Sequence, residues 1–381
     1  MSKRILHIIT DEQFTDYVIR QFLAPEMNSE FVLIPCNHED WSVELKDRCR
    51  VVLRGSKEFA CLLEELGHYS AILFHGMFWG KWQTSILQRV PNEVKVAWVF
   101  WGGDLFARHE IGNRFLAPIT KCFSKMHGLK KREKSGGMTD TAWEIPIDLY
   151  KRVDYCITSL KEEYDFACQF TNASFVHFWY SYYSIEDTIG KVVMNNRCDG
   201  NNIWIGNSAA LVNNHMDVFW HLCKNGLLRN LTERKVIMPL SYGEPWVRNM
   251  VKRVGQFLFG KRMKVLEKYI PRNEYNAMML SCSTMIIGYL EPAANGNIMT
   301  ALWLGIRVYL SEKSIAYVYY KRIGCQVFSI ESDLNSRNIN CFTALSDEEL
   351  QQNRKALTQE YGKQRTDKAV RDLVSELTTR Y

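Results

Sequence analysis

Short apolar runs alternate with segments of helical periodicity through the first half of the chain. The runs are nearly continuous in aliphatic and aromatic residues, which is typical of strands buried on both faces. Segments of helical period lie between several of them, for example at 14–23 and 57–66. The predicted strands are 4–10, 31–35, 51–53, 71–75, 94–101 and 155–159.

The second half starts the same alternation again. Predicted strands are 203–206, 236–240, 263–265, 284–289, 308–310 and 327–329, and predicted helices are 215–225, 247–257, 273–281 and 298–304. The polar stretch 187–202 has no periodicity and is interpreted as a linker. From residue 346 the chain is strongly helical, and Ser346 with Glu349 forms a capping-box pattern at its start.

Buried strands joined by helical crossovers predict a parallel sheet with helices on both faces, once in each half. With 381 residues the chain is long enough for two cores. The sequence therefore predicts two open α/β domains with a cleft between them. In such sheets ligands bind at the carboxyl ends of the strands, so residues that follow strands are the candidates for chemistry.

The amino-acid composition excludes only a few classes of protein. A formal net charge of +6 is too small to indicate nucleic acid, but it suits contact with anionic lipid or anionic substrates. The 11 cysteines include no C-x-x-C pair, and no histidine cluster accompanies them, so a structural zinc site is not expected. No apolar stretch approaches the roughly 18 residues of a spanning helix, and the amino terminus lacks a signal-peptide pattern.

Two turns in the second half suit a phosphate group. Gly206, Asn207 and Ser208 follow a predicted strand, where Gly206 permits a tight turn and Ser208 can cap the next helix. Asn295, Gly296 and Asn297 open a second helix after another strand. Unpaired amides and the partial positive charge at a helix start favour anions. Each turn is also compatible with an ordinary connection.

Other residues after strands are candidates with structural alternatives. Glu291 could accept hydrogen bonds from sugar or ribose hydroxyls or be a solvated loop charge, and Tyr242 could line the same cleft or belong to a plain turn. His75 could act as a base, or balance a leaving phosphate, or be structural. Asp104 follows Gly102 and Gly103 and could be a general base or a helix cap.

The segment 121–134 carries six basic residues and one acidic residue, with apolar side chains between them. Such a segment attracts an anionic membrane at about 1 kcal/mol per basic residue near the surface. A solvated loop is the alternative.

These segments, in this order, resemble the bacterial TDP-4-acetamido-4,6-dideoxygalactose transferases of enterobacterial common antigen synthesis, glycosyltransferase family 56. The resemblance extends from about residue 5 to residue 334. It is carried by Phe74-His-Gly-x-Phe, Trp101-Gly-x-Asp-Leu, Ile205-Gly-Asn-Ser with Asn214-His215, Met238-Pro with Tyr242, and the segment from Gly296 to Gly305.

The resemblance implies a GT-B fold, in which two Rossmann-like domains face each other across a cleft. Residues 1–190 would bind a polyprenyl-diphosphate-linked acceptor, 200–345 a nucleotide-sugar donor, and the helices of 346–381 would return to the first domain. The implied donor residues are Gly206, Asn207, Ser208, Tyr242, Tyr275, Glu291, Asn295, Gly296 and Asn297. Thr300 stands where many such enzymes carry a second glutamate.

On the acceptor and membrane side the expected residues are Asp104 and His75 as bases, with Trp79, Lys130, Lys131 and Arg132 contacting acceptor or lipid. No D-x-D triplet lies at a strand end, so transfer without a metal or other cofactor is expected. The expected partners are a TDP- or UDP-linked sugar, a lipid-linked glycan and an anionic membrane surface, at the cytoplasmic face of the bacterial inner membrane. No nucleic acid is expected.

Two alternatives remain open from the sequence. One is another enzyme on the same scaffold, such as a nucleotide-sugar epimerase or a polysaccharide pyruvyl transferase, because fold does not fix function. The other is a non-catalytic scaffold for polysaccharide assembly. Two phosphate-type turns in one domain would then have no use, which makes this alternative the weakest.

Overall fold

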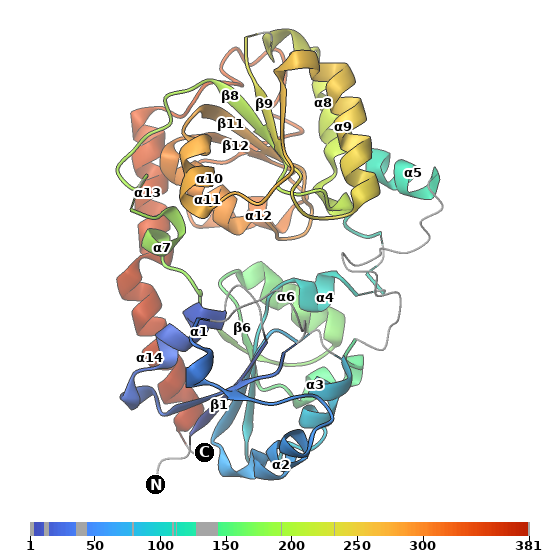
Figure 1. The fold of residues 1–381 in the computed structure, drawn as a ribbon. Coiled ribbons are helices and arrows are strands. Elements are labelled where there is room, and N and C mark those ends of the chain that lie inside the picture. Colours follow the sequence, from blue (N-terminus) through green and yellow to red (C-terminus); the bar gives the residue numbers. More distant parts are fainter. Residues whose placement is uncertain are drawn as a thin grey trace. The chain divides into compact units, whose positions relative to one another are not determined.

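A computed structural model gives the fold (Figure 1). It describes residues 4–10, 15–35, 44–77, 80–108, 110–111, 113–126, 144–191, 193–231 and 233–379. The described chain divides into two compact units. Unit 1 contains the residues up to Arg108, those from Glu144 to Ser184 and those from Lys363 onward; unit 2 contains 110–126 and 185–362. The sequence-based boundary near 190 placed 110–126 in the first domain, whereas packing places this segment in unit 2.

Unit 1 is built on a seven-stranded parallel sheet in the order β3-β2-β1-β4-β5-β6-β7. Its strands are β1 (Ile5–Ile9), β2 (Ser29–Leu33), β3 (Arg50–Val51), β4 (Ala71–His75), β5 (Lys95–Val99), β6 (Tyr155–Ile157) and β7 (Val176–Phe178). The first six match predicted strands, and β7 was not predicted. Its helices are α1 (Thr15–Phe22), α2 (Lys57–Glu65), α3 (Gly80–Leu87), α4 (Gly103–Phe106), α6 (Lys161–Thr171) and α14 (Lys363–Thr378).

Unit 2 holds a six-stranded parallel sheet in the order β10-β9-β8-β11-β12-β13. Its strands are β8 (Asn202–Ile205), β9 (Val236–Pro239), β10 (Met263–Leu266), β11 (Cys282–Ile287), β12 (Arg307–Leu310) and β13 (Phe328–Ser329). Its helices are α5 (Pro118–Met126), α7 (Ile185–Ile189), α8 (His215–Lys224), α9 (Pro245–Phe259), α10 (Arg272–Met279), α11 (Asn295–Leu304), α12 (Ile315–Arg322) and α13 (Asp347–Tyr361). All six strands were predicted, whereas α5, α7 and α12 were not.

The predicted linker 187–202 is only partly irregular. It includes the end of α7, which packs against α11 and α13. The N–H of Cys198 donates to the carbonyl of Leu304 over 2.8 Å, and that of Asp199 to the carbonyl of Leu280 over 3.1 Å. Backbone hydrogen bonds to the domain therefore hold the end of this stretch in place, although its side-chain pattern is polar.

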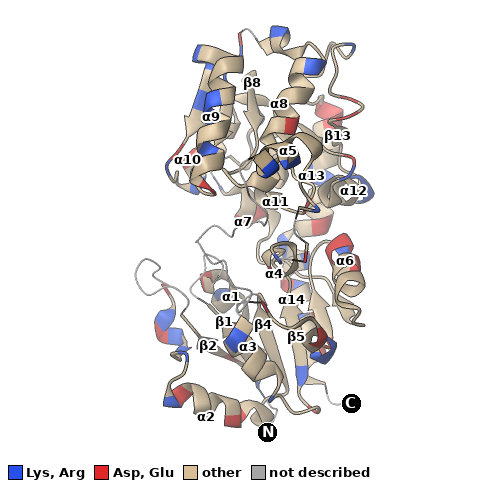
Figure 2. Ribbon diagram, turned by 90° about the vertical axis from the view of Figure 1, so that its right-hand side faces the viewer, with Lys and Arg blue, Asp and Glu red and all other residues tan. Residues whose placement is uncertain are grey.

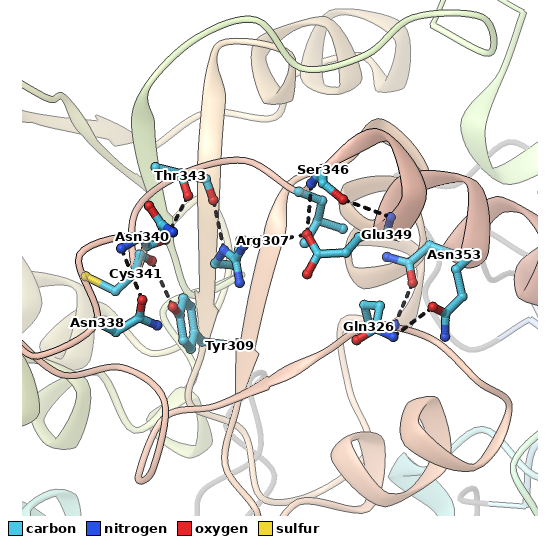
Figure 3. Close-up of polar contacts among 12 residues, drawn as sticks. Arg307, Tyr309, Gln326, Asn338, Asn340, Cys341, Thr343, Ser346, Glu349 and Asn353 are labelled. Carbon is cyan, nitrogen blue, oxygen red and sulfur yellow. Dashed lines mark hydrogen bonds and ion pairs between the residues drawn. The ribbon is translucent and has the colours of Figure 1, made fainter.

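The chain end crosses back as the resemblance implied. Ser346 and Glu349 form the predicted capping box at the start of α13 (Figure 3). Arg307 donates to the carbonyl of Thr343 over 2.9 Å and lies 3.7 Å from the Glu349 carboxylate, which fastens this start to β12 (Figure 3). After α13 the chain enters unit 1, where α14 lies beside α1 and β1 (Figure 1).

The core of unit 1 shows why α14 belongs there. Its buried residues Val370, Leu373, Val374 and Leu377 share one apolar cluster with β1, β4 and β5. The Lys95 ammonium donates to the carbonyls of Glu376 and Thr379, at 2.7 and 3.0 Å, and so holds the end of the helix. No helix in the described part of the chain is long and apolar enough to cross a membrane.

Candidate active site

Both sheets reverse their direction of growth at one point, and ligands of open α/β sheets generally bind there, outside the carboxyl ends of the strands. In unit 2 the reversal lies between β8 and β11, and in unit 1 between β1 and β4. Gly206 follows β8 directly, and Tyr289 and Glu291 follow β11. His75 is the last residue of β4, and Asp104 lies just after the neighbouring β5. Predicted site residues of both halves therefore lie near these two points.

Only glycine fits the first position after β8. Gly206 has a φ of +74°, a region that costs other residues strain. A Cβ atom there would lie 2.3 Å from Nε2 of His215. His215 is itself buried, its Nε2 has no hydrogen-bond partner among the described residues, and burial lowers its pKa to about 4. The neutral ring of His215 is thus packed tightly against the turn.

The expectation that Ser208 caps a helix is wrong. Helix α8 begins only at His215, after Asn214 in a left-handed conformation. The Ser208 side chain is completely buried, and its hydroxyl bonds with Tyr289 at 3.1 Å and accepts from the Asn213 amide at 2.8 Å. Ser208 therefore organises the loops inside unit 2.

The backbone amides of this first turn are largely taken. The N–H of Asn207 donates to Oδ1 of Asn213 over 3.0 Å, and that of Leu211 donates to the Glu244 carboxylate over 3.1 Å. The N–H of Gly206 completes the sheet by donating to Ile286. The structure thus gives no support to a diphosphate held by the amides of Gly206 and Asn207.

The second turn is different. Helix α11 follows Ala294, which is left-handed at φ +61° and provides no side-chain cap. The N–H groups of Asn295, Gly296 and Asn297 have no acceptor among the described residues. The space where a Cβ of Gly296 would lie is open to 4 Å, and Oδ1 of Asn295 is buried with no hydrogen-bond partner in the part of the chain that the structure describes. A ten-residue helix with a bare amino end is suited to an anion.

Four predicted side chains meet beside this helix end. The Asn297 amide donates to the side-chain oxygen of Asn207 and to the hydroxyl of Tyr275, the latter over 3.0 Å. The Asn207 amide donates to the hydroxyl of Tyr242 over 2.5 Å. The Tyr242 side chain is still 57% exposed. Two asparagines that can donate to phosphate and an accessible tyrosine ring therefore lie within one connected network.

Two further donor-side candidates are placed less favourably. The Thr300 hydroxyl donates back to the carbonyl of Gly296 over 2.8 Å, and the residue is buried, so its hydrogen is used inside α11. Glu291 is also buried, just after β11.

In unit 1, Asp104 joins the loops after β4 and β5. Its buried carboxylate accepts from the N–H of Met77 at 2.7 Å, from the indole of Trp98 at 2.6 Å and from the N–H of Trp101 at 3.2 Å. It is the second residue of α4, whose cap is Gly102. Burial raises the pKa of Asp104 to about 6, against the opposing effect of these hydrogen bonds. Both carboxylate oxygens are thus engaged by donors inside unit 1.

His75 belongs to a buried relay of polar groups. Its Nε2 lies 3.1 Å from Nδ1 of His7, and its Nδ1 lies 3.0 Å from the hydroxyl of Tyr182, which also accepts from the indole of Trp101. Burial, and then the neighbouring His7, holds the pKa of His75 well below its usual value. Both nitrogens are occupied and the ring is neutral, which opposes its use as a base or as a cation.

Sequence reasoning missed His7 and Tyr182 in this relay. His7 gave one signal, because it is a single polar residue within the apolar run of β1. Tyr182 gave none, since its partners lie 81 and 107 residues away in the chain. Trp79, Lys130, Lys131 and Arg132 lie outside the described residues. Among the residues described, no group of three or more His, Cys, Asp or Glu side chains could hold a metal ion.

No protein-family model matches the chain, and no curated protein sequence matches it. Solved structures do. A glycosyltransferase from Rickettsia africae ESF-5 aligns with a TM-score of 0.66 at 10% identity over 100% of both chains. Anabaena HepE, solved in complex with UDP and glucose, gives 0.60 at 10% identity over 98% of this chain and 99% of its own.

The lipopolysaccharide outer core galactosyltransferase WaaB gives a TM-score of 0.58 at 9% identity, over 98% of this chain and 99% of its own. At such identities the likeness shows the fold. The chain has the two-unit α/β architecture of GT-B glycosyltransferases, as predicted.

Proposed function

We propose that the protein is a glycosyltransferase that moves a deoxyamino sugar from a TDP- or UDP-linked donor to a polyprenyl-diphosphate-linked saccharide. The observation that carries the proposal is the bare amino end of α11 beside the Asn207–Asn297–Tyr242–Tyr275 network, at the reversal point of the second sheet. The GT-B fold supports it, as do the glycosyltransferases among its structural neighbours.

In this proposal the amides of residues 295–297 hold the diphosphate, and the helix end balances the charge that develops on the leaving group. The side-chain amides of Asn207 and Asn297 turn from each other toward phosphate oxygens. Tyr242 and Tyr275 approach the base and ribose, with Glu291 and Thr300 behind them. Gly206 and Ser208 shape the loop that presents Asn207.

Asp104 is the proposed base for the acceptor hydroxyl, because its pKa of about 6 suits proton transfer near neutral pH. His75 is the weaker candidate. Transfer proceeds without a metal, so a chelator leaves turnover unchanged. A polyprenyl-linked acceptor requires the enzyme to work at a membrane, and we propose the cytoplasmic face of the bacterial inner membrane. The donor, the acceptor and this location follow the resemblance to family 56.

Calorimetric titration with UDP, TDP and GDP tests the donor site. Asn297→Asp keeps the size of the side chain but replaces a donor by an anion, so we expect nucleotide affinity to fall at least about tenfold. Asn249→Asp, at an exposed position of α9, adds the same charge and should leave affinity unchanged. If none of the three nucleotides binds the wild-type protein, the proposal fails and a scaffold role is favoured.

Turnover with and without a lipid-linked acceptor separates the enzyme classes. A transferase releases nucleoside diphosphate at a rate that depends on the acceptor, whereas an epimerase converts its nucleotide sugar with no acceptor present. A pyruvyl transferase would release no nucleoside diphosphate at all.

A further inference from the structure

In three neighbouring helices of unit 2 the charged residues are almost all basic. Helices α5, α8 and α9 contain six Lys or Arg residues and a single acidic residue, Asp217. Both carboxylate oxygens of Asp217 accept backbone N–H groups at the start of α5, from Ile119 and Thr120 at 2.8 Å each. The acidic side chain is therefore used to attach α5 to α8, which leaves the basic side chains uncompensated by acids of these helices.

Four of the six cations are exposed and have no ion-pair partner in the described part of the chain. They are Lys121, Lys125, Lys224 and Arg253. The other two are engaged: Lys252 pairs with Glu267 at 2.5 Å, and Arg248 donates to the carbonyl of Leu240 at 2.7 Å. Figure 2 colours Lys and Arg positions blue along the ribbons of both α5 and α9.

Each helix also exposes a large apolar side chain beside its free cation. Met126 is 67% exposed and follows Lys125, Trp220 is 56% exposed and lies one turn before Lys224, and Phe257 is 88% exposed and lies one turn after Arg253. Residues four apart on a helix share a face. The cation and the apolar group therefore share a face on α8 and α9, whereas on α5 Met126 is the next residue after Lys125 at the exposed end of the helix.

The three helices lie next to one another. α8 contacts both α5 and α9 along the same side of the unit (Figures 1 and 2). Large apolar side chains that lie singly among cations suit a bilayer interface, where rings and thioethers enter the headgroup region and lysine or arginine heads meet lipid phosphates. A soluble acidic partner would complement the charge and leave these apolar groups in water.

We infer that the exposed side chains of α5, α8 and α9, here called the three-helix surface, bind an anionic lipid bilayer. This extends the proposed function, since a lipid-linked acceptor must be met at a membrane, but it is tested without any enzymatic turnover. It also places the contact on unit 2, through helices that the basic segment 121–134 by itself did not indicate.

Sedimentation of the full-length protein with vesicles tests the inference. We expect strong binding to vesicles containing phosphatidylglycerol, little binding to pure phosphatidylcholine, and weaker binding as salt rises. Reversing Lys121, Lys125, Lys224 and Arg253 to Glu should lower the partition coefficient by roughly 100-fold or more. A matched control reverses four other exposed lysines, Lys57, Lys81, Lys313 and Lys355, and changes the net charge equally. Equal loss in both variants would overturn the inference, because only total charge would then matter.

The chain offers an internal probe for the same surface. Cys122 of α5 and Cys61 of α2 are both exposed. Anionic vesicles should slow the reaction of Cys122 with a water-soluble maleimide and leave that of Cys61 unchanged, as measured by peptide mass spectrometry. Unchanged reaction of Cys122 while the protein is bound would place the contact elsewhere.

Two further outcomes separate this inference from others. The double variant Trp220→Ser, Phe257→Ser should reduce the vesicle binding that persists at high salt. If this variant has no effect and the protein binds soluble heparin as tightly as vesicles, the surface is a general polyanion site and the lipid inference is overturned. Nucleotide binding measured on the same samples distinguishes failure here from failure of the proposed donor site.

Discussion

At the scale of single residues, the turn after β8 shows how a glycine and a histidine depend on each other. The neutral His215 ring occupies the space that any side chain at 206 would need. The positive φ adds a second restriction. Asn207 is carried on this turn, so the position of one proposed ligand follows from a packing contact that involves no ligand.

Gly206→Ala is therefore expected to lower the free energy of unfolding by at least about 2 kcal/mol. Urea denaturation measures the change. Gly296→Ala is the matched control, because nothing lies within 4 Å of its added Cβ, and it should change stability by no more than about 1 kcal/mol. Equal stability of the two variants would show that the His215 ring moves away from the added methyl group at little cost in free energy.

Asp104 is expected to control the acid limb of the pH profile of turnover. Its pKa is raised to about 6, so the ionised base is lost as pH falls below that value. Asn at this position should lower kcat by about 10²–10⁴-fold and remove the limb near pH 6. Nucleotide affinity, measured by calorimetry, should stay unchanged. Near-normal turnover of Asp104→Asn would exclude the assignment.

At the scale of elements, α5 shows that a side chain on one helix can fix another. Arg108 belongs to unit 1 and α5 to unit 2, and Asp217 of α8 caps α5 by accepting from two of its free N–H groups. Asn214 adds a hydrogen bond from the N–H of Ala117 at 2.9 Å. The nine-residue α5 is too short to be stable alone, so these bonds account for its presence.

Asp217→Ala should thus release α5 while the rest of unit 2 remains folded. The cost in free energy of unfolding is expected near 1 kcal/mol, the usual value of an amino-terminal cap. Hydrogen exchange should become faster over residues 118–126 and remain slow in β8 and β11. Asp148→Ala, which removes an exposed ion pair with Lys151, should change neither. Slow exchange in α5 of the Asp217 variant would contradict the capping role.

At the scale of the whole molecule, buried titratable groups set the dependence of stability on pH. Burial lowers the pKa of His7 to about 3 and that of His215 to about 4, and also lowers the pKa of His75. The contribution of these histidines to the free energy of unfolding is complete above pH 6.5. It is lost as pH falls through their folded-state pKa values, because the histidines bind protons in the unfolded chain and not in the folded one.

Glu163 acts in the opposite direction. Burial raises its pKa to about 8, so its contribution is complete below pH 4.5 and is lost as pH rises through 8. Asp104 similarly favours the folded state below pH 6 and offsets part of the histidine effect there.

We therefore expect maximal stability near pH 6.5, measured by urea denaturation between pH 4.5 and 8.5. Glu163→Gln should flatten the alkaline side, since its slope of up to about 1.4 kcal/mol per pH unit is removed. Glu64→Gln, at an exposed position of α2, should leave that side unchanged. An alkaline limb that persists in Glu163→Gln would show that another group causes it.

The sequence by itself determined the two parallel sheets, the start of α11 and the capping box of α13. Apolar runs, a glycine after a strand and a Ser-x-x-Glu pattern act over a few residues, so local spacing is enough to find them. Only the tertiary structure decided the rest. These features depend on partners far apart in the chain. They are the relay of His7, His75 and Tyr182, the hydrogen bonds that Asp104 accepts, the acceptors that engage the amides of Asn207 and Leu211, and the position of α5. Hydrogen bonding and burial join such partners only after the sheets have formed, and a linear pattern does not record which distant groups will meet.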